Sequence, residues 1–437
     1  MDILTTLKKQ AEQVEVFNLK NEKTTVEFEA NQLKSCSVTQ AKGTAVRVIR
    51  RGRLGFSATT DPTSVDKLVA NVLESADYGD QTSFSFADPK PAVPVKTYDN
   101  TISELPIDRL VEIGKEILDQ IVPVDPNVRC NLSLARGLVS TNIRNQKGLD
   151  VSTQTSPFML SIKLDRMEEN DILIRYDQFG ATVWEEDYLA FARRLAEQIK
   201  LASILTTIKP GRMPVLFSPA GAQALIMPLG EALNGKEVYK GTSPIKDKID
   251  EKLFDEKITL LDDGTMDGCF GSTSYDDEGV PHCRNVLVEK GVLKSFIYDL
   301  KTAAQAETES TGNAVRSLFT QPDVSFGNFI LQPGQTPLKD IIASIDEGIL
   351  VESLLGLGMG NTISGAFSNP LDLAFKIEKG EIVGRVKDLS IAGSIYDLLK
   401  DVAAISQEAQ WNYNFFYPPY IYAPYVLIPE MNVAGKS

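Results

Sequence analysis

The chain has 437 residues, more than one hydrophobic core usually accommodates, so two or three domains are expected. Lysine and arginine total 45 against 59 aspartate and glutamate residues, and the resulting net charge of −14 disfavours a general role in binding nucleic acid. We expect a cytoplasmic protein, because the N-terminus lacks a signal-peptide pattern and no run of about 18 apolar residues occurs.

The first predicted unit, residues 1–85, is a sheet followed by a helix. Apolar and polar residues alternate from residue 13 through VEVFNLK, TTVEFEA, SCSVTQ, TAVRVIR and LGFSAT, a period of two that is typical of antiparallel strands. A helix is predicted next, with Asp61 as a candidate N-cap and Pro62 in the first turn. The face expected to cover the sheet carries Val65, Leu68, Val69, Val72 and Leu73.

The segment 78–103 is rich in Pro, Asp and Ser and has no periodicity, so it is interpreted as a connection over the surface. The second predicted unit, residues 104–208, repeats the combination of sheet and helix, with strands expected from about 127 to 177. Its two helices are marked by Leu110, Ile113, Ile117 and Ile121, and by Tyr188, Phe191, Leu195 and Ile199.

The third predicted unit, residues 211–437, is rich in strands. NVLVEKGVLKSFIYD (285–299) and AFKIEKGEIVGRV (374–386) share a Glu-Lys-Gly turn between apolar runs, where glycine supplies the positive φ of a tight hairpin. The predicted fold class is therefore α+β: N-terminal antiparallel sheet-and-helix units followed by a strand-rich C-terminal sandwich or barrel-like domain.

Two glycine- or acid-rich segments resemble ligand loops but are assigned to turns. Gly356, Gly358 and Gly360 are followed by strand-like sequence, whereas a dinucleotide loop needs a helix there. In DDGTMDG (262–268), counting from Asp263 places Ser274 where a calcium loop needs a bidentate glutamate. No cofactor is expected from either segment.

The thiols and the only histidine give no convincing catalytic pattern. Cys36, Cys130, Cys269 and Cys283 lack metal-ligand spacing, so we expect buried, reduced thiols. His282 and Cys283 are adjacent, and neighbours on a strand point to opposite faces, so hairpin packing is preferred over a nucleophilic pair.

The segment WNYNFFYPPYIYAPYV (411–426) concentrates aromatic residues among prolines, which prevent a regular helix. Two interpretations stay open for it. It is either filling for the core or an edge, or an aromatic groove or subunit contact.

Several segments together resemble the TldD/PmbA family, whose members were once called modulators of DNA gyrase. They are DDEGVPHCRNVLVEKGVL (276–293), STGNAVR (310–316) and the later GNTISGAFS, IEKGEI and SIAGSI elements. The resemblance covers nearly the whole chain and implies a cytoplasmic two-subunit metalloprotease that cleaves unfolded peptides.

In that family the active subunit carries an HExxxH helix and a distant cysteine as metal ligands. The resemblance places these helix positions at Ile226, Met227 and Glu231, within IMPLGEALNGK (226–236), and the cysteine region near Phe415. Neither isoleucine nor a methionine thioether suits zinc, so no catalytic or metal-binding residue is predicted. The chain therefore resembles the PmbA/TldE-type subunit, the partner without metal.

The aromatic segment is expected to fill the space left by the metal. Phe415, Phe416 or Tyr417 should contact Ile226 or Met227. Two further tyrosines, Tyr420 and Tyr422, should stay available to a peptide or a partner.

The leading hypothesis is a non-catalytic subunit that works with a TldD-like metalloprotease subunit on unfolded peptides. The alternative is a homodimeric peptide-binding or scaffold protein with no protease partner. An enzyme with unrecognised chemistry and a regulator of gyrase remain as further alternatives. Neither nucleic acid nor a membrane is expected as a partner.

Overall fold

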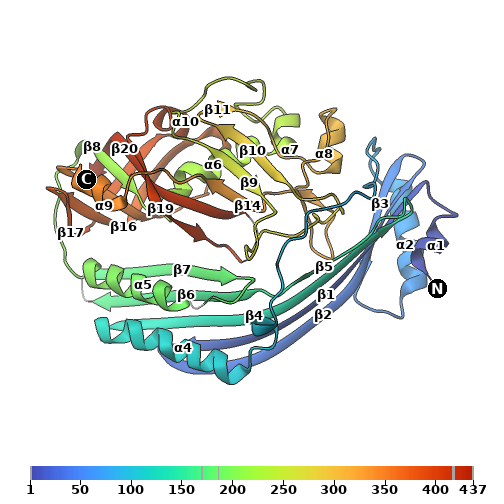
Figure 1. Ribbon diagram of the computed structural model, residues 1–437, viewed down its shortest axis with the longest axis horizontal. Coiled ribbons are helices and arrows are strands. Elements are labelled where there is room, and N and C mark those ends of the chain that lie inside the picture. The colour runs from blue at the N-terminus through green and yellow to red at the C-terminus, as the bar shows by residue number, and fades with distance from the viewer. Residues whose placement is uncertain (1, 169–170, 186, 416–418, 436–437) are drawn as a thin grey trace.

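The computed structural model describes residues 2–168, 171–185, 187–415 and 419–435. Two bodies follow one another along the chain: a long, curved half-barrel sheet and a strand-rich C-terminal domain that lies over its concave side (Figure 1). This arrangement confirms the α+β class and the strand-rich second half. In the described part of the chain, no helix is long and apolar enough to cross a membrane.

The half-barrel sheet has the strand order β3-β2-β1-β4-β6-β7, with β5 paired to β4. All of its strand pairs are antiparallel. The strands are β1 (Gln13–Glu29), β2 (Gln32–Arg50), β3 (Arg53–Thr59), β4 (Val128–Asn145), β5 (Asp150–Thr155), β6 (Phe158–Glu168) and β7 (Asp171–Ala181). Because β1 pairs with β4 from Glu15 to Phe28, one continuous sheet runs through the two units predicted at 1–85 and 104–208.

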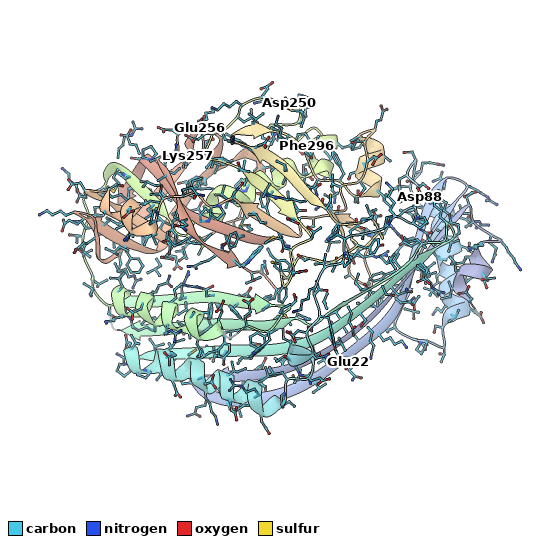
Figure 2. All side chains as sticks on the ribbon, in the orientation of Figure 1. Glu22, Asp88, Asp250, Glu256, Lys257 and Phe296 are labelled. Atoms are coloured by element: carbon cyan, nitrogen blue, oxygen red, sulfur yellow. The ribbon has the colours of Figure 1, made fainter. Side chains whose placement is uncertain are left out.

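Helices cover the convex face of this sheet at its two ends and leave its middle open, where Glu22 lies (Figures 1 and 2). One group packs on Val14, Val16, Val46 and Val48, and the other packs on the row that includes Val26, Leu132 and Ile162. These helices are α1 (Ile3–Leu7) and α2 (Val65–Tyr78) at one end, and α3 (Asn100–Ser103), α4 (Ile107–Ile121), the 3-10 helix η1 (Val122–Val124) and α5 (Tyr188–Ala202) at the other.

The predicted start of the first long helix is wrong, because α2 begins at Val65 rather than near Pro62. The Asp61 carboxylate instead accepts hydrogen bonds from the backbone N–H of Thr63 (2.8 Å) and the hydroxyl of Ser64 (2.5 Å). These bonds lower the pKa of Asp61 to about 2 and stabilise a turn ahead of the helix.

The connection between the two N-terminal segments runs as an extended strap over residues 79–99, along which Asp88 is seen in Figure 2. The expectation of a surface connection is wrong for part of it, because Phe84 and Phe86 are 5% and 1% exposed. Farther along, the backbone N–H of Lys96 donates to the carboxylate of Asp267 (2.7 Å). The strap therefore ties the sheet to the C-terminal domain.

The C-terminal sheet has the order β11-β10-β9-β14-β20-β18-β16-β15-β8 and closes on itself, because β8 pairs with both β15 and β20. A barrel-like closure is thus found rather than a two-sheet sandwich. The strands are β8 (Gly211–Phe217), β9 (Leu260–Asp263), β10 (Arg284–Glu289), β11 (Val292–Leu293), β14 (Asn328–Leu331), β15 (Glu347–Leu354), β16 (Ala366–Glu378), β17 (Glu381–Val386), β18 (Leu389–Ser394), β19 (Ala404–Asn412) and β20 (Tyr420–Gly435), beside a separate pair of β12 (Ala314–Val315) and β13 (Asp323–Val324).

Short helices fill and flank this domain. The apolar face of α6 lies in the main core with Val215, Phe329 and Val351. The helices are α6 (Gln223–Leu233), α7 (Gly235–Tyr239), α8 (Leu300–Gln305), α9 (Leu338–Ala343), the 3-10 helix η2 (Thr362–Ser364) and α10 (Ile395–Leu398).

Both predicted Glu-Lys-Gly hairpins are confirmed as β10–β11 and β16–β17. Lys290 and Gly291 have φ of 47° and 80°, and Lys379 and Gly380 have φ of 49° and 79°. Two consecutive left-handed residues are the geometry of a tight hairpin turn, and the glycine takes the second position without steric cost.

Candidate functional site

The candidate site is a cavity of about 640 Å³ between the concave face of the half-barrel sheet and the C-terminal domain. Five strands of the sheet, β1, β2, β4, β6 and β7, supply one wall. The other wall comes from the residues just before and at the start of α6, the end of β15 and the residues after β19. The cavity therefore exists only because the two bodies face each other.

Cross-strand neighbours build the wall on the sheet side. Strand register pairs Glu27 with Ser133, Ser133 with Ser161, and Ser161 with Gln178, so these side chains form a row across four strands. The amide of Gln178 donates to the hydroxyl of Ser161 (3.2 Å). Beside this row, the ammonium of Lys163 lies 5.8 Å from the ring centre of Tyr176.

The opposite wall carries polar side chains beside apolar ones. Its members are Ala220, Gln223, Glu352, Ser353, Leu354, Leu357, Asn412, Tyr413 and Asn414. The polar groups of this wall are amides, hydroxyls and the carboxylate of Glu352. They lie opposite the hydroxyl, amide and charged side chains of the sheet. Such a lining both donates and accepts hydrogen bonds, as a peptide backbone requires.

A buried charged group lies where β7 meets the C-terminal domain. Glu352 and Arg175 are 5% and 6% exposed. Burial raises the pKa of Glu352, and the positive charge of Arg175 opposes this shift. Arg175 also pairs with Asp177 at 3.5 Å, while its Nε has no hydrogen-bond partner among the described residues.

The three positions at which the resemblance places the metal helix, Ile226, Met227 and Glu231, lie in different surroundings. Ile226 lies in the main core and is 1% exposed. Met227 is half-buried, and its methyl group lies beside Gly358, 3.8 Å from the position that a Cβ atom on that glycine would take. Glu231 is exposed. One carboxylate, a thioether and an isoleucine do not fit a zinc ion, and no three His, Cys, Asp or Glu side chains gather as a metal site in the described part of the chain.

The aromatic segment joins the two bodies beside the cavity. The ring of Phe415 lies 5.2 Å from that of Phe270 and 5.7 Å from that of Tyr413. A Cβ on Gly180 of β7 would come within 2.9 Å of both Phe270 and Phe415, so the absence of a side chain there permits close packing. Of the other predicted residues, Phe416 and Tyr417 lie outside the described residues.

This segment lies near the start of α6, because the Asn412 side-chain amide donates to the carbonyl of Pro219 (3.0 Å). Contact of Phe415 with Ile226 or Met227 nevertheless stays a prediction. The predicted contact residues Tyr420 and Tyr422 are half-buried. Their rings lie 5.4 Å from Phe270 and 5.0 Å from Trp411, respectively.

The expectation of four buried thiols is wrong: Cys130 is buried, Cys269 is intermediate, and Cys36 and Cys283 are exposed. All four are free thiols. Cys36 is exposed because it lies on a stretch of β2 beyond the part that pairs with β3, and no other described strand joins it there; alternation alone could not predict this arrangement.

His282 and Cys283 have different neighbours. The imidazole of His282 packs on Gly264, and burial lowers its pKa to about 4. The thiol of Cys283 donates to the side-chain oxygen of Asn285 (3.2 Å), and although the residue as a whole is exposed, partial desolvation of its sulfur raises the pKa. A thiol with a raised pKa is a poor nucleophile.

The family-like motifs lie at the junction between the bodies. In DDEG, Asp276 accepts hydrogen bonds from the backbone N–H groups of Glu278 (2.9 Å) and Val280 (2.8 Å). In TGNAVR, the Asn313 side chain donates to Asp262 (2.6 Å), which lies in the acidic segment assigned to a turn. The motifs thus fix loop conformations beside the sheet.

Four buried side chains, called here the four-charge cluster, link these motifs to the sheet. Arg47 donates to both carboxylate oxygens of Glu15 (2.9 and 2.7 Å) and to Glu278 (2.7 Å). Arg316 donates to Glu15 (2.8 Å) and its guanidinium lies 4.0 Å from the ring centre of Phe17. At the other end of the sheet, Asp171 similarly pairs with Arg385 and Lys387 of the C-terminal domain (3.0 and 2.6 Å).

The cavity-lining residues of the sheet were not predicted. Ser133, Ser161, Lys163 and Gln178 are polar residues that alternate with apolar ones along a strand, a pattern that looks the same for a solvent-exposed face. No local signal in the sequence could distinguish these two situations, because the second wall comes from residues that are distant in the chain.

The chain thus folds into two bodies, a half-barrel sheet and a closed C-terminal sheet, with a cavity between them. Comparison with protein-family models identifies the class of protein to which this chain belongs. Residues 210–435 match the PmbA/TldA metallopeptidase C-terminal domain and residues 14–76 match PmbA/TldA metallopeptidase domain 1. The chain belongs to the TldD/PmbA family.

Individual relatives agree with this assignment. The chain is 28% identical over 390 residues to a metalloprotease of Methanothermobacter thermautotrophicus, covering 86% of this chain and 84% of that protein. It is 31% identical over 226 residues to a metalloprotease TldD homolog of Buchnera aphidicola, covering 51% and 47% of the two chains. The crystal structure of TldE from Thermococcus kodakarensis is similar with a TM-score of 0.90 at 25% identity, and 99% of each chain is covered.

Proposed function

We propose that this chain is the metal-free subunit of a two-subunit TldD/PmbA-type peptidase, acting in the cytoplasm, and that its cavity holds part of an extended, unfolded peptide. The alignment of the metal helix with Ile226, Met227 and Glu231 carries the first half of the proposal. The polar cavity between the two bodies carries the second half.

The absence of a ligand set supports a non-catalytic role. The chain contains one histidine, so it has no HExxxH motif, which needs two. Ile226 is part of the main core, and a side chain buried there is not available to a bound peptide. Hydrolysis in the complex would therefore depend on a TldD-like subunit that supplies the metal site.

The dimensions and chemistry of the cavity support peptide binding. The row from Glu27 to Gln178 crosses four strands, or about 14 Å at the usual strand spacing of about 4.8 Å, which matches about four residues of extended peptide. Serine, glutamine and asparagine side chains hydrogen-bond backbone groups whatever the peptide sequence, so recognition of this kind would be general.

The test combines this chain with a TldD-like subunit that carries HExxxH and measures cleavage of an unstructured fluorogenic peptide. We expect cleavage by the mixture and none by this chain alone. Ser133→Tyr, which narrows the cavity, should weaken peptide binding and slow cleavage. Ser140→Tyr is the matched control, since Ser140 lies on the same strand but on its opposite face.

Equal effects of the two tyrosine substitutions would overturn the assignment of the cavity. Cleavage by this chain alone, abolished by Cys283→Ser, would overturn the non-catalytic role. Peptide binding by this chain with no stimulation of any TldD-like subunit would favour the alternative of a homodimeric peptide-binding scaffold.

A further inference from the structure

A glycine-rich segment, residues 355–361, follows β15 at the wall of the cavity and is called here the glycine loop. The cavity lining includes Leu354, the last residue of β15, and Leu357 within the loop. Farther along the loop, Met359 is 85% exposed. Apolar side chains that gather beside a cavity, rather than lying scattered over the surface, are typical of a ligand-binding groove.

The glycine loop is fixed at its two ends. The backbone N–H of Leu355 donates to the carbonyl of Pro370 (2.9 Å), and the carbonyl of Leu355 accepts from the side-chain amide of Asn369 (2.7 Å). Just after the loop, the carbonyl of Gly365 accepts from the backbone N–H of Ile395 (2.9 Å). These bonds to β16 and α10 determine where the loop lies on the cavity wall.

The middle of the loop can change its conformation. Gly356, Gly358 and Gly360 have φ of 72°, 81° and 101°. Close packing does not require these glycines, because a Cβ on any of them would meet no atom closer than 3.6 Å. The N–H of Met359 donates locally, to the carbonyl of Gly356 (3.1 Å). Since glycines at alternate positions leave the backbone many accessible conformations, the loop can adjust to a ligand.

The apolar part of this wall rests on the core of the C-terminal domain. Leu354, Met227 and Ile363 pack against the main core. Met227 belongs to α6 and lies beside Gly358 of the loop, and Ile363 belongs to η2, just after the loop. The loop therefore changes conformation above a supported apolar surface.

The two walls of the cavity offer different surfaces to an extended peptide, because such a peptide presents alternate side chains to opposite sides. One set of side chains would meet the row of Ser133, Ser161 and Gln178 on the sheet. The other set would meet Leu354 and Leu357. Burial against leucine is favourable for an apolar side chain, whereas the row on the sheet offers hydrogen bonds. A strand with one apolar and one polar face fits both walls.

We propose that the glycine loop makes the cavity selective for unfolded segments in which apolar residues alternate with polar ones. The inference rests on the proposed peptide-binding function and adds the class of peptide. Leu357 is the specificity-determining residue, and an aliphatic or aromatic side chain of the peptide packs on it and on Leu354. Met359 has an adaptable side chain that can cover side chains of either shape.

A peptide is the favoured occupant for a chemical reason. The row on the opposite wall provides hydrogen-bond donors and acceptors for a peptide backbone, and an apolar small molecule could not use them. The pattern of alternating apolar and polar residues is also the one that a core strand exposes when its protein unfolds.

Fluorescence anisotropy of labelled peptides with the isolated chain tests the selectivity. The peptides are unstructured and equal in length and charge. One has a pair of leucines separated by a serine, another has the same leucines adjacent, and the last has alanines in place of the leucines. The first should bind at least about tenfold more tightly than the last, since one missing methylene in an apolar pocket costs about 10–200-fold. The adjacent pair should bind with intermediate affinity, because only one of its leucines faces Leu357.

Variants of the loop separate selectivity from folding. Leu357→Ser should abolish the preference for leucine and leave the binding of the alanine peptide unchanged, and Leu357→Met should retain the preference. Leu355→Ser is the matched control and should behave as the wild type, because Leu355 is 52% exposed on the same loop and lies outside the cavity lining. Circular dichroism verifies that the variants fold.

The outcomes distinguish the selectivity from the proposed function. Equal binding of the leucine and alanine peptides by the wild type would overturn the inference and leave the peptide-binding function standing. A preference that survives in Leu357→Ser, or that is lost equally in Leu355→Ser, would do the same. If the wild type binds none of the peptides, the proposed function itself fails, and the inference fails with it.

Discussion

Replacement of Arg47 should remove the ion pair that joins the DDEG loop to the half-barrel sheet, and it should thereby lower the free energy of unfolding. The Arg47 side chain is buried and pairs with both Glu15 and Glu278. In Arg47→Met, Glu15 keeps Arg316, whereas Glu278 loses its cation and stays buried. Breaking one buried ion pair in this way costs about 3–5 kcal/mol, so we expect a loss of about 4 kcal/mol in the free energy of unfolding at pH 7.

Urea-induced unfolding followed by tryptophan fluorescence measures this loss. The two tryptophans lie in different bodies, Trp184 beside the half-barrel sheet and Trp411 in the C-terminal sheet, so the signal reports both. A transition that becomes biphasic in the variant would itself show that the four-charge cluster couples the bodies.

The pH dependence of the loss gives a second criterion. Burial raises the pKa of Glu278 above its ordinary value of 4.5 even with Arg47 present. A raised carboxyl pKa favours folding fully below the unfolded value and loses this contribution as pH rises through the folded value. The deficit of Arg47→Met should therefore shrink as pH is lowered toward about 4.5, the unfolded value.

The double variant Arg47→Met with Glu278→Gln removes the stranded charge and should be more stable than Arg47→Met alone. Glutamine keeps an oxygen for the backbone N–H of Leu300, which now donates to Glu278 (2.8 Å). A loss below about 1 kcal/mol, of the size of an exposed pair, or a deficit that grows in acid would refute the reasoning.

Four further predictions concern the site and its surroundings. The purified chain should hold less than stoichiometric zinc by elemental analysis, because Ile226, Met227 and Glu231 offer one ligand; one tightly bound zinc per chain would contradict this. Cys283→Ser and His282→Ala should leave the stimulation of a TldD-like subunit unchanged in the peptide-cleavage assay, and its loss would indicate a catalytic role. Gly291→Ala should lower the free energy of unfolding in urea by more than about 1 kcal/mol, because Gly291 has a positive φ and a Cβ would meet the Phe254 carbonyl at 2.1 Å. Gly211→Ala is the control and should be nearly neutral, because no atom lies within 4 Å of the position of its Cβ. Burial lowers the pKa of His282 from 6.5 to about 4, so its contribution to stability is present above pH 6.5 and is lost as pH falls through about 4. His282→Ala should therefore flatten the dependence of stability on pH between these two values. An unchanged pH dependence would disprove that His282 is buried in its neutral form.

Local patterns in the sequence predicted local structure well. The apolar spacing at Leu110, Ile113 and Ile117 corresponds to α4, and the Glu-Lys-Gly turns correspond to hairpins with left-handed Lys and Gly. These features depend on neighbours within a few residues, so the information lies in a short window.

Features that join distant segments could not be predicted. Nothing near β1 specifies that Glu27 lies beside Ser133, or that Arg47 meets Glu278 across 231 positions of sequence. The exposure of Cys36 likewise depends on where β3 stops, and the cavity depends on how two bodies face each other. The family resemblance gave one long-range expectation, the contact of Phe415 with Ile226 or Met227, and that contact stays a prediction.

The last strand has a consequence for how the chain is made. Strand β20 (Tyr420–Gly435) pairs with β8, β14, β18 and β19, so the C-terminal sheet closes only when its final residues are available. The strands of the half-barrel, by contrast, end at Ala181. Synthesis at about 5–20 residues per second leaves a delay of about 12–50 s between these two points, during which the apolar side chains that later surround β20 await their partner. A ribosome that stalls or releases the chain early would thus yield an aggregation-prone product with an intact first half.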